Sequence, residues 1–281
     1  MKRKRYIYNP NPIFVKPLNQ KKRPAFIRYA MKCAKDIDVA RSEINYVIKP
    51  KNPRTGNKIV RFRRLNEHRA RAMRAIVQAM LYHYNIASEL VLASVEQLSD
   101  ECGLSTVSLA GNKSITRASR LITDFMEPMG FVVCEKIWDN IIKTYIPKMI
   151  TITPLFFMLF GISKFKLDNA RRQHLGWINS CLKEKGEPSI TVIEAKRIAK
   201  DIHIKNAFKH RKSIYIFNKQ RNQAKKLIEL DEKSAKQKIL QDLVKRYSIG
   251  ELVDMGVNGL KKQVSMEYFR IKKIAGNIFF R

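Results

Sequence analysis

Residues 94–130 read SVEQLSDECGLSTVSLAGNKSITRASRLITDFMEPMG, and this spacing predicts two helices joined by a loop. Ser94 can cap the first helix, because Gln97 follows it at the three-residue distance of a capping box. Gly103 then ends that helix, as glycine commonly does. A loop over residues 105–113 leads to Ser114, which can cap a second helix ending at Gly130. The stretch is therefore typical of a helix-turn-helix.

The neighbouring segments extend this pattern. Apolar residues at three- and four-residue spacings predict a helix over residues 63–84, and a short strand is predicted at residues 90–93. After the second helix, two β-rich runs flank the dipeptide Asp139-Asn140 and predict a hairpin of residues 131–138 and 141–146. Residues 149–153 are a candidate third strand, and a further helix is predicted from residue 154 to 160. The order helix, strand, helix, turn, helix, hairpin is that of a winged helix.

The two segments on either side of this region differ in their proline content. Residues 1–60 hold six of the ten prolines, a density that blocks long helices, whereas residues 163–281 contain only Pro188. In the latter segment, helices are predicted at residues 168–185, 191–209, 235–247 and 259–275. We therefore expect a mainly α protein with a small β wing. Its parts are a basic Pro-rich segment (1–62), a winged-helix DNA-binding domain (63–162) and a basic helical C-terminal domain (163–281), in which a degenerate second winged helix stays open.

The charge is large and unevenly placed. The 281 residues include 56 Lys and Arg against 24 Asp and Glu, a formal net charge of +32. Residues 1–75 carry +18, residues 76–160 carry −2 and residues 161–281 carry +16. Such a charge implies a polyanionic partner, and a metabolic enzyme with small neutral substrates is disfavoured. Basic flanks can neutralise DNA phosphates without reading sequence, so a sequence reader is expected in the near-neutral centre.

The second helix of residues 94–130 has the properties of a DNA-reading helix. On a helical wheel its apolar residues fall in one arc and its polar residues in the opposite arc, with Arg117 and Arg120 in the first two turns. Arginine can pair with guanine, and threonine can meet a thymine methyl group or a phosphate. The candidate DNA-binding residues are Lys113, Ser114, Thr116, Arg117, Arg120 and Thr123, with Lys136 and Lys143 on the wing and Arg69 on the preceding helix. The alternative is an amphipathic surface helix whose arginines are only solvated.

Several other classes lose support. The four cysteines are far apart, so no zinc finger is predicted, and they are expected to be reduced thiols of a cytoplasmic protein without a secretory signal. The longest uncharged run, residues 149–163, contains Pro154 and is shorter than the roughly 20 residues of a membrane span. No second histidine stands near His83 to hold a nicking metal, and the phosphate-binding motif GxxxxGK[ST] is absent. We expect neither enzyme activity nor a cofactor.

Several strings resemble one family, the replication initiators (RepA) of IncFII-type plasmids. They are residues 101–104 (ECGL), the loop 105–113, residues 114–120 (SITRASR), the early NPNP at 9–12, His83-Tyr84, Tyr145-Ile-Pro147 and residues 150–153 (ITIT). The similarity is dense from about residue 65 to 160. It implies a DNA-binding protein that binds double-stranded DNA at its own plasmid's origin, prepares strand separation and engages the host initiator and replicative helicase. Lysine outnumbers arginine, 34 to 22, where the family's C-terminal segment is usually arginine-rich, so the role of that half stays open.

Two alternatives use the same features. A winged-helix transcriptional regulator of a plasmid or phage would share the reading helix but would load no helicase. A basic RNA-binding protein would stack bases on exposed aromatic side chains, whereas Phe156, Phe157 and Phe160 are better explained as core. After nucleic-acid binding, attraction of the basic flanks to a membrane surface is the main remaining explanation of the charge.

Overall fold

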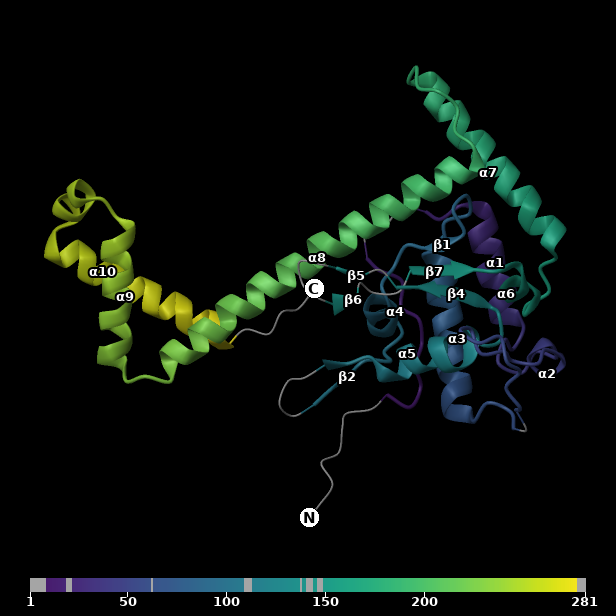
Figure 1. The fold of residues 1–281 in the computed structure, drawn as a ribbon, viewed down its shortest axis with the longest axis horizontal. Helices are drawn as coiled ribbons and strands as arrows, with labels where there is room; N and C mark the ends of the chain where they lie inside the picture. The colour runs from purple at the N-terminus through teal and green to yellow at the C-terminus, as the bar shows by residue number, and fades with distance from the viewer. Residues whose placement is uncertain are drawn as a thin grey trace, which may run out of the picture. The chain divides into compact units, whose positions relative to one another are not determined.

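The computed structural model describes residues 9–18, 22–61, 63–108, 113–136, 138–139, 144–145 and 149–276. These residues are mainly helical, with a small antiparallel sheet (Figure 1). Two compact units divide the chain, one up to Ala207 and one from Phe208 onward. Helix α8 (Val192–Ile228) crosses the boundary between them.

The amino-terminal unit is arranged around helix α3. Helix α1 packs against α3, and helices α4 and α5 also contact it. In chain order the unit's helices and strands before α8 are α1 (Ala25–Asp36), α2 (Ile44–Val47), α3 (Glu67–Tyr82), β1 (Leu90–Val91), α4 (Val95–Glu101), β2 (Thr106–Val107), β3 (Lys113–Ser114), α5 (Thr116–Leu121), the π-helical turn η1 (Ile122–Met126), β4 (Val132–Glu135), β5 (Trp138–Asp139), β6 (Thr144–Tyr145), β7 (Met149–Ile152), α6 (Pro154–Met158) and α7 (Lys164–Glu184).

The main sheet has the strand order β1-β7-β4, and both pairings are antiparallel. Leu90 pairs with Thr151 on one side of β7, and Val133 pairs with the same residue on the other side. Beyond β4, the short strands β5 and β6 pair with each other. The predicted pairing of residues 131–138 with 141–146 is therefore wrong for its first half. The partner of β4 is the uncharged segment of residues 149–152, three of whose four residues are buried in the centre of the sheet.

Capping side chains set the helix starts. Ser94 accepts a hydrogen bond from the Gln97 amide at 3.1 Å, which confirms the predicted cap of α4. Helix α3 begins at Glu67 rather than residue 63, because Asn66 caps it by accepting from the Arg69 amide at 2.9 Å. The prediction that Ser114 caps α5 is wrong. Ser114 lies in β3 opposite Thr106, and α5 starts after Ile115.

The segment before residue 63 is more regular than its prolines suggest. Helix α1 starts directly after Pro24, and the interval to Pro50 contains no other proline. Ile27, Ala30 and Ala34 fall on one face of α1 at helical spacing and are buried. The expectation of an irregular segment is wrong here, because prolines restrict only the positions next to them.

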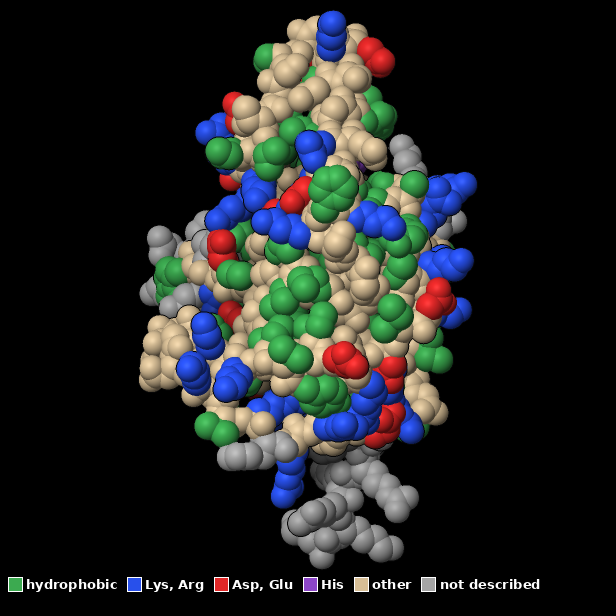
Figure 2. All heavy atoms as spheres, turned by 90° about the vertical axis from the view of Figure 1, so that its right-hand side faces the viewer, with side chains coloured by type: hydrophobic (Ala, Val, Ile, Leu, Met, Phe, Trp, Pro, Cys, Tyr) green, Lys and Arg blue, Asp and Glu red, His purple; other side chains and the backbone are tan. Residues whose placement is uncertain are grey.

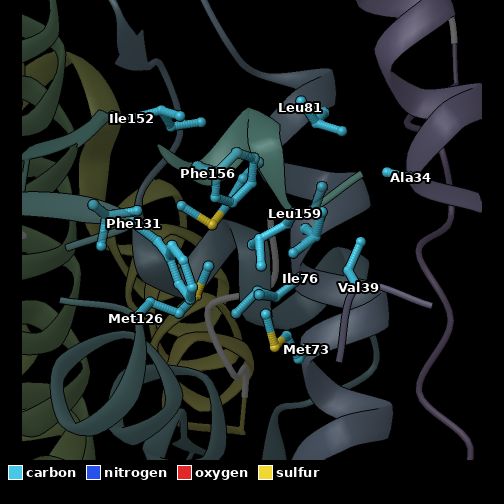
Figure 3. Close-up of a cluster of buried hydrophobic side chains, with 14 of the residues drawn as sticks. Ala34, Val39, Met73, Ile76, Leu81, Met126, Phe131, Ile152, Phe156 and Leu159 are labelled. Carbon is cyan, nitrogen blue, oxygen red and sulfur yellow. The ribbon is translucent and has the colours of Figure 1, made fainter. Parts of the chain in front are cut away.

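A single hydrophobic core holds the amino-terminal unit together. Figure 3 shows side chains of α1, α3, the sheet and the segment after β7 converging, among them Ile76, Phe131, Phe156 and Leu159. All four are at most 1% exposed. Phe156, Phe157 and Phe160 are buried with ring centroids 5.7–5.8 Å apart, which confirms the prediction that they form core.

Ion pairs fasten α7 and the first part of α8 to this core. Arg171 of α7 pairs with Glu89 at 2.8 Å, and Lys196 of α8 pairs with the same carboxylate at 2.5 Å. Lys200 reaches Glu135 of β4 at 2.6 Å. Glu89 itself has a positive φ of 61°, which is uncommon for a residue other than glycine.

The carboxyl-terminal unit has a much smaller core. It contains the end of α8, α9 (Glu232–Arg246) and α10 (Ile249–Gly276), which is interrupted at Gly256 with φ 58°. Ile239, Leu243 and Val264 form the buried cluster, with five half-buried side chains around it. Helix α8 continues well past the predicted end at residue 209, since residues 192–228 contain no glycine or proline. Among the helices that the structure describes, none is both long and apolar enough to cross a membrane.

Candidate nucleic-acid interface

Helix α5 and the π-helical turn η1 form one amphipathic element. Its predicted apolar arc is confirmed, because six of the seven residues are buried and the seventh, Ile115, packs against the core. The six are Ala118, Leu121, Ile122, Phe125, Met126 and Met129. The opposite face therefore points away from the core, towards a possible ligand.

The π-helical turn follows from Pro128. Proline has no amide hydrogen, and inside an α-helix its ring would collide with the carbonyl four residues earlier, here that of Asp124. The helix widens instead, and the Glu127 amide donates to the Ile122 carbonyl five residues back at 2.9 Å. Such turns are rare in proteins, and those that occur are often found at functional sites.

Arg120 is the most available cation on the outward face. Its side chain is exposed and forms no ion pair with any residue that the structure describes. Thr116 is also exposed, one turn earlier, and its hydroxyl lies 2.8 Å from that of Ser114. Together they present a guanidinium and two hydroxyl groups, the groups that can bond base edges and phosphates.

Arg117 is engaged within the protein. Its Nη1 donates to the backbone carbonyl of Asn9 at 2.8 Å, which attaches residues 9–15 across this end of α5. Two further bonds hold this strap: Arg71 Nη1 donates to Asn11 Oδ1 at 2.9 Å, and the Val15 amide donates to the Glu101 carbonyl at 2.9 Å. In the sequence the strap is marked only by the NPNP motif of residues 9–12.

Lys113 is neutralised by helix α4. Its Nζ lies 2.6 Å from Asp100 Oδ2 and 2.9 Å from Glu96 Oε1. Burial opposes the charged form, but the two carboxylates outweigh it and raise the pKa of Lys113. Its charge is thus compensated by two carboxylates within the protein.

The remaining predicted residues lie at the edges of this face. The Thr123 hydroxyl is 2.8 Å from the Ser119 carbonyl oxygen and 2.9 Å from Asp124 Oδ1. Arg69 Nη2 is 3.9 Å from Asp124 Oδ2, a loose pair on an exposed surface. Lys136 is exposed at the end of β4. Lys143 lies outside the described residues.

A second basic group lies beside this helix, in the segment for which the prolines predict only that long helices are absent. Residues 49–61 and 63–64, here called the basic arm, contact the carboxyl end of the element. The Lys51 amide donates to the Pro128 carbonyl at 2.8 Å, and the Arg61 guanidinium lies over the Phe125 ring, 4.7 Å from its centroid. Burial is the main cause that lowers the pKa of Arg61, and the nearby charge of Arg69 adds to it. The sequence shows the charges of the arm but not its neighbour, because that contact joins residues far apart in the chain.

Several basic side chains elsewhere are paired with acids. Figure 2 shows blue and red side chains next to each other along the lower edge of one face. Arg74 of α3, for example, contacts Asp38 at 2.7 Å and Glu67 at 2.8 Å. In the part of the chain that the structure describes, no group of three or more His, Cys, Asp or Glu side chains could hold a metal ion.

Comparisons with known proteins identify the family. A model described as the IncFII RepA protein family matches residues 2–276. A probable replication-associated protein repA1 of Buchnera aphidicola subsp. Schizaphis graminum (strain Sg) is 65% identical over 275 residues, which cover 98% of this chain and 97% of that protein. A probable replication-associated protein repA2 of the same organism is 50% identical over 274 residues, 98% of each chain.

A more distant relative comes from another bacterium. A replication initiation protein of Escherichia coli is 31% identical over 182 residues, which cover 65% of this chain and 61% of that protein. No solved structure matches the chain. Because the family model and the close relatives span nearly all of the sequence, the chain belongs to the IncFII RepA protein family.

Proposed function

We propose that the chain is a plasmid replication initiator that binds double-stranded DNA at the origin of its own plasmid and helps to recruit the host initiator and replicative helicase. It acts in the cytoplasm as a DNA-binding protein, without strand cleavage and without a cofactor. Membership of the family and the name of the Escherichia coli relative, a replication initiation protein, support the replication role.

The single observation that carries DNA reading is the exposure of Arg120 on a helix whose opposite face is core. An arginine without an internal carboxylate partner can form a bidentate pair with guanine in the major groove. Thr116 and Ser114 stand one to two turns away to contact phosphate or a thymine methyl group. Lys113 and Arg117, by contrast, contribute to the shape of the site through bonds within the protein.

The proposed domain is a winged helix. Helix α3 is followed by β1, α4, α5 and the hairpin of β4 and β7, and β1 pairs with the outer side of β7. This order supports a recognition helix α5 and a wing formed by β4, β5, β6 and β7. Lys136 is exposed where β4 ends, which supports its proposed role as a contact to the DNA backbone.

Footprinting tests the proposal. The full chain is incubated with fragments of the plasmid that carries its gene, at physiological salt, and DNase I protection is mapped. We expect one protected region in the origin, with permanganate-reactive thymines appearing beside it when host initiator and helicase are added. Protection confined to a promoter, with no reactive thymines, would favour a transcriptional regulator. Nicking of supercoiled origin DNA would contradict the non-enzymatic role.

A further inference from the structure

The basic arm has an ordered turn at its tip. Asn52 organises it: its Oδ1 accepts from the Arg54 amide at 2.9 Å, and its carbonyl accepts from the Gly56 amide at 2.8 Å. Gly56 has φ 72°, a conformation that glycine adopts without strain. The Asn52 amide donates to the Asn57 carbonyl at 2.8 Å, so Lys51 and Lys58 face each other across the base of the turn. This turn is formed before any ligand binds, which lowers the entropy cost of binding.

The cations of the arm lack acidic partners. Lys49, Lys51, Arg54, Lys58 and Arg63 are all exposed, and none forms an ion pair with a described residue. The fifteen positions from Lys49 to Arg63 thus hold five exposed cations without an acidic partner among the described residues, whereas the arginines of α3 are paired with carboxylates. Lysine and arginine side chains that neutralise phosphates release the counterions condensed on DNA, and a cation without an acidic partner is free to do so.

The arm has a fixed place relative to the proposed reading helix. The Lys51–Pro128 bond and the Arg61–Phe125 contact attach it to the carboxyl end of α5 and η1. A groove of about 440 Å³ lies between the arm and this helical element. Its lining includes Arg61, Arg64, Arg69 and Phe125. In the view of Figure 1, β5 and β6 lie to the left of α5, and α2, which the arm follows, lies to its right. The arm therefore lies at the carboxyl end of α5 and η1.

We propose that the basic arm is a second DNA contact, which holds the sugar–phosphate backbone on one flank of the base pairs that α5 reads. The inference rests on the proposed function. Lys51, Arg54 and Lys58 at the turn contact successive phosphates, and the arm adds affinity without sequence preference. Because the arm is attached to only one end of the helix, it extends the contacted DNA in one direction only.

A charge-matched pair of variants tests the proposal. The first carries Lys51→Gln, Arg54→Gln and Lys58→Gln. The control carries Arg28→Gln, Lys32→Gln and Lys35→Gln on α1, which removes the same one arginine and two lysines from exposed positions on a helix that packs against α3. Affinity of the full-length proteins for a 30-base-pair duplex of arbitrary sequence is measured across salt concentrations. A hydroxyl-radical footprint is then recorded on the plasmid origin.

We expect the arm variant to flatten the slope of log K against log salt by about 2 to 3, since each phosphate contact contributes roughly 0.9. Its footprint should shorten on one side only, while the control keeps the wild-type slope and footprint. Equal slopes for the two variants, or an unchanged footprint in the arm variant, would overturn the inference. So would loss of binding to phosphatidylserine vesicles with unchanged duplex binding, which would assign the arm to a membrane surface. A wild-type chain that protects no plasmid DNA defeats the proposed function, whereas an arm variant with a normal footprint defeats this inference alone.

Discussion

Arg74 and Arg120 carry the same charge in opposite surroundings. Arg74 on α3 is held between two carboxylates, with Nη2 2.7 Å from Asp38 and Nη1 2.8 Å from Glu67. Arg120 on α5 is exposed and has no acidic partner among the described residues. The first is expected to support the fold and the second to serve a ligand. Net charge therefore overstates the charge that this protein can offer to a polyanionic ligand, and the positions of the 24 acids decide which cations remain available.

The largest effect is expected from Arg120→Ala. Loss of a bidentate arginine–guanine pair costs about 1–3 kcal/mol of discrimination, so the preference for origin over scrambled DNA should fall by roughly 10- to 100-fold. Binding to arbitrary duplex should remain and stay salt-sensitive. Competition binding at physiological salt measures the ratio.

Arg120→Lys is the matched control, because lysine keeps the charge but cannot form the planar two-bond contact. It should lose the preference almost as completely as alanine does while retaining more affinity for arbitrary duplex. If Arg120→Ala still distinguishes origin from scrambled DNA, α5 is not the reading helix.

Arg74→Ala is expected to have the opposite effect to Arg120→Ala: it should lower the stability of the fold and leave duplex affinity unchanged. The three side chains are more than a third exposed, so solvent screening limits the loss to about 1 kcal/mol. For a unit of this size that corresponds to a fall in melting temperature of roughly 2–4 °C. Thermal unfolding followed by circular dichroism measures it, and a ten-fold drop in duplex affinity without a change in melting temperature would contradict the division of roles.

The same ion pairs predict how stability depends on pH. The hydrogen bond from Arg74 lowers the pKa of Asp38, and hydrogen bonds from Arg74 and then Arg41 lower the pKa of Glu67. A carboxyl group whose folded pKa is depressed stabilises the fold above its unfolded pKa, here 3.8 and 4.5, and loses that contribution as pH falls through the folded value. Urea unfolding should show wild type more stable than Asp38→Asn at pH 7, with the difference shrinking below about pH 4. If the difference in the free energy of unfolding stayed constant down to pH 3, Arg74 would not lower the pKa of Asp38 in the folded protein.

The smallest effect is expected from Lys113→Gln. The side chain is already paired with Glu96 and Asp100, so duplex affinity should stay within about two-fold and the salt slope should not change. Duplex affinity is measured across salt concentrations for this variant and for Arg120→Gln, which removes one positive charge from the same region. An equal loss of duplex affinity in both variants would show that Lys113 leaves its carboxylate partners and binds DNA phosphate instead.

The features predicted correctly from the sequence depend on neighbours within a few positions. The Ser94 cap, the end of α4 at Gly103 and the apolar arc of α5 all follow from local spacing. The sequence predicts the order α3, β1, α4 and α5 for the same reason, but it does not predict α1, α2 or the β2–β3 pair within the expected loop of residues 105–113. The choice of β7 as the central strand could not be predicted either, since strand pairing depends on which segments meet across the sheet.

The candidate site was predicted less well than its helix. A helical wheel places Arg117 and Arg120 on the same face, but only the fold brings Asn9 to Arg117. In the same way, Lys113 meets α4 because the β2–β3 pairing returns the chain to it. Contacts over such distances along the chain leave no periodic pattern in the sequence, and they separate the engaged cations from the available ones.

The central position of β7 has a consequence for synthesis of the protein. β1, α4, α5 and β4 all leave the ribosome before Met149–Ile152, the strand that joins β1 to β4. Until that strand emerges, both neighbours present unpaired backbone edges, and the core that orients α5 lacks Ile150 and Ile152. A nascent or truncated chain that stops before residue 149 therefore has every candidate base-reading side chain but no scaffold to hold them in place. Translation must pass the last strand of the sheet before the core that orients α5 can be completed.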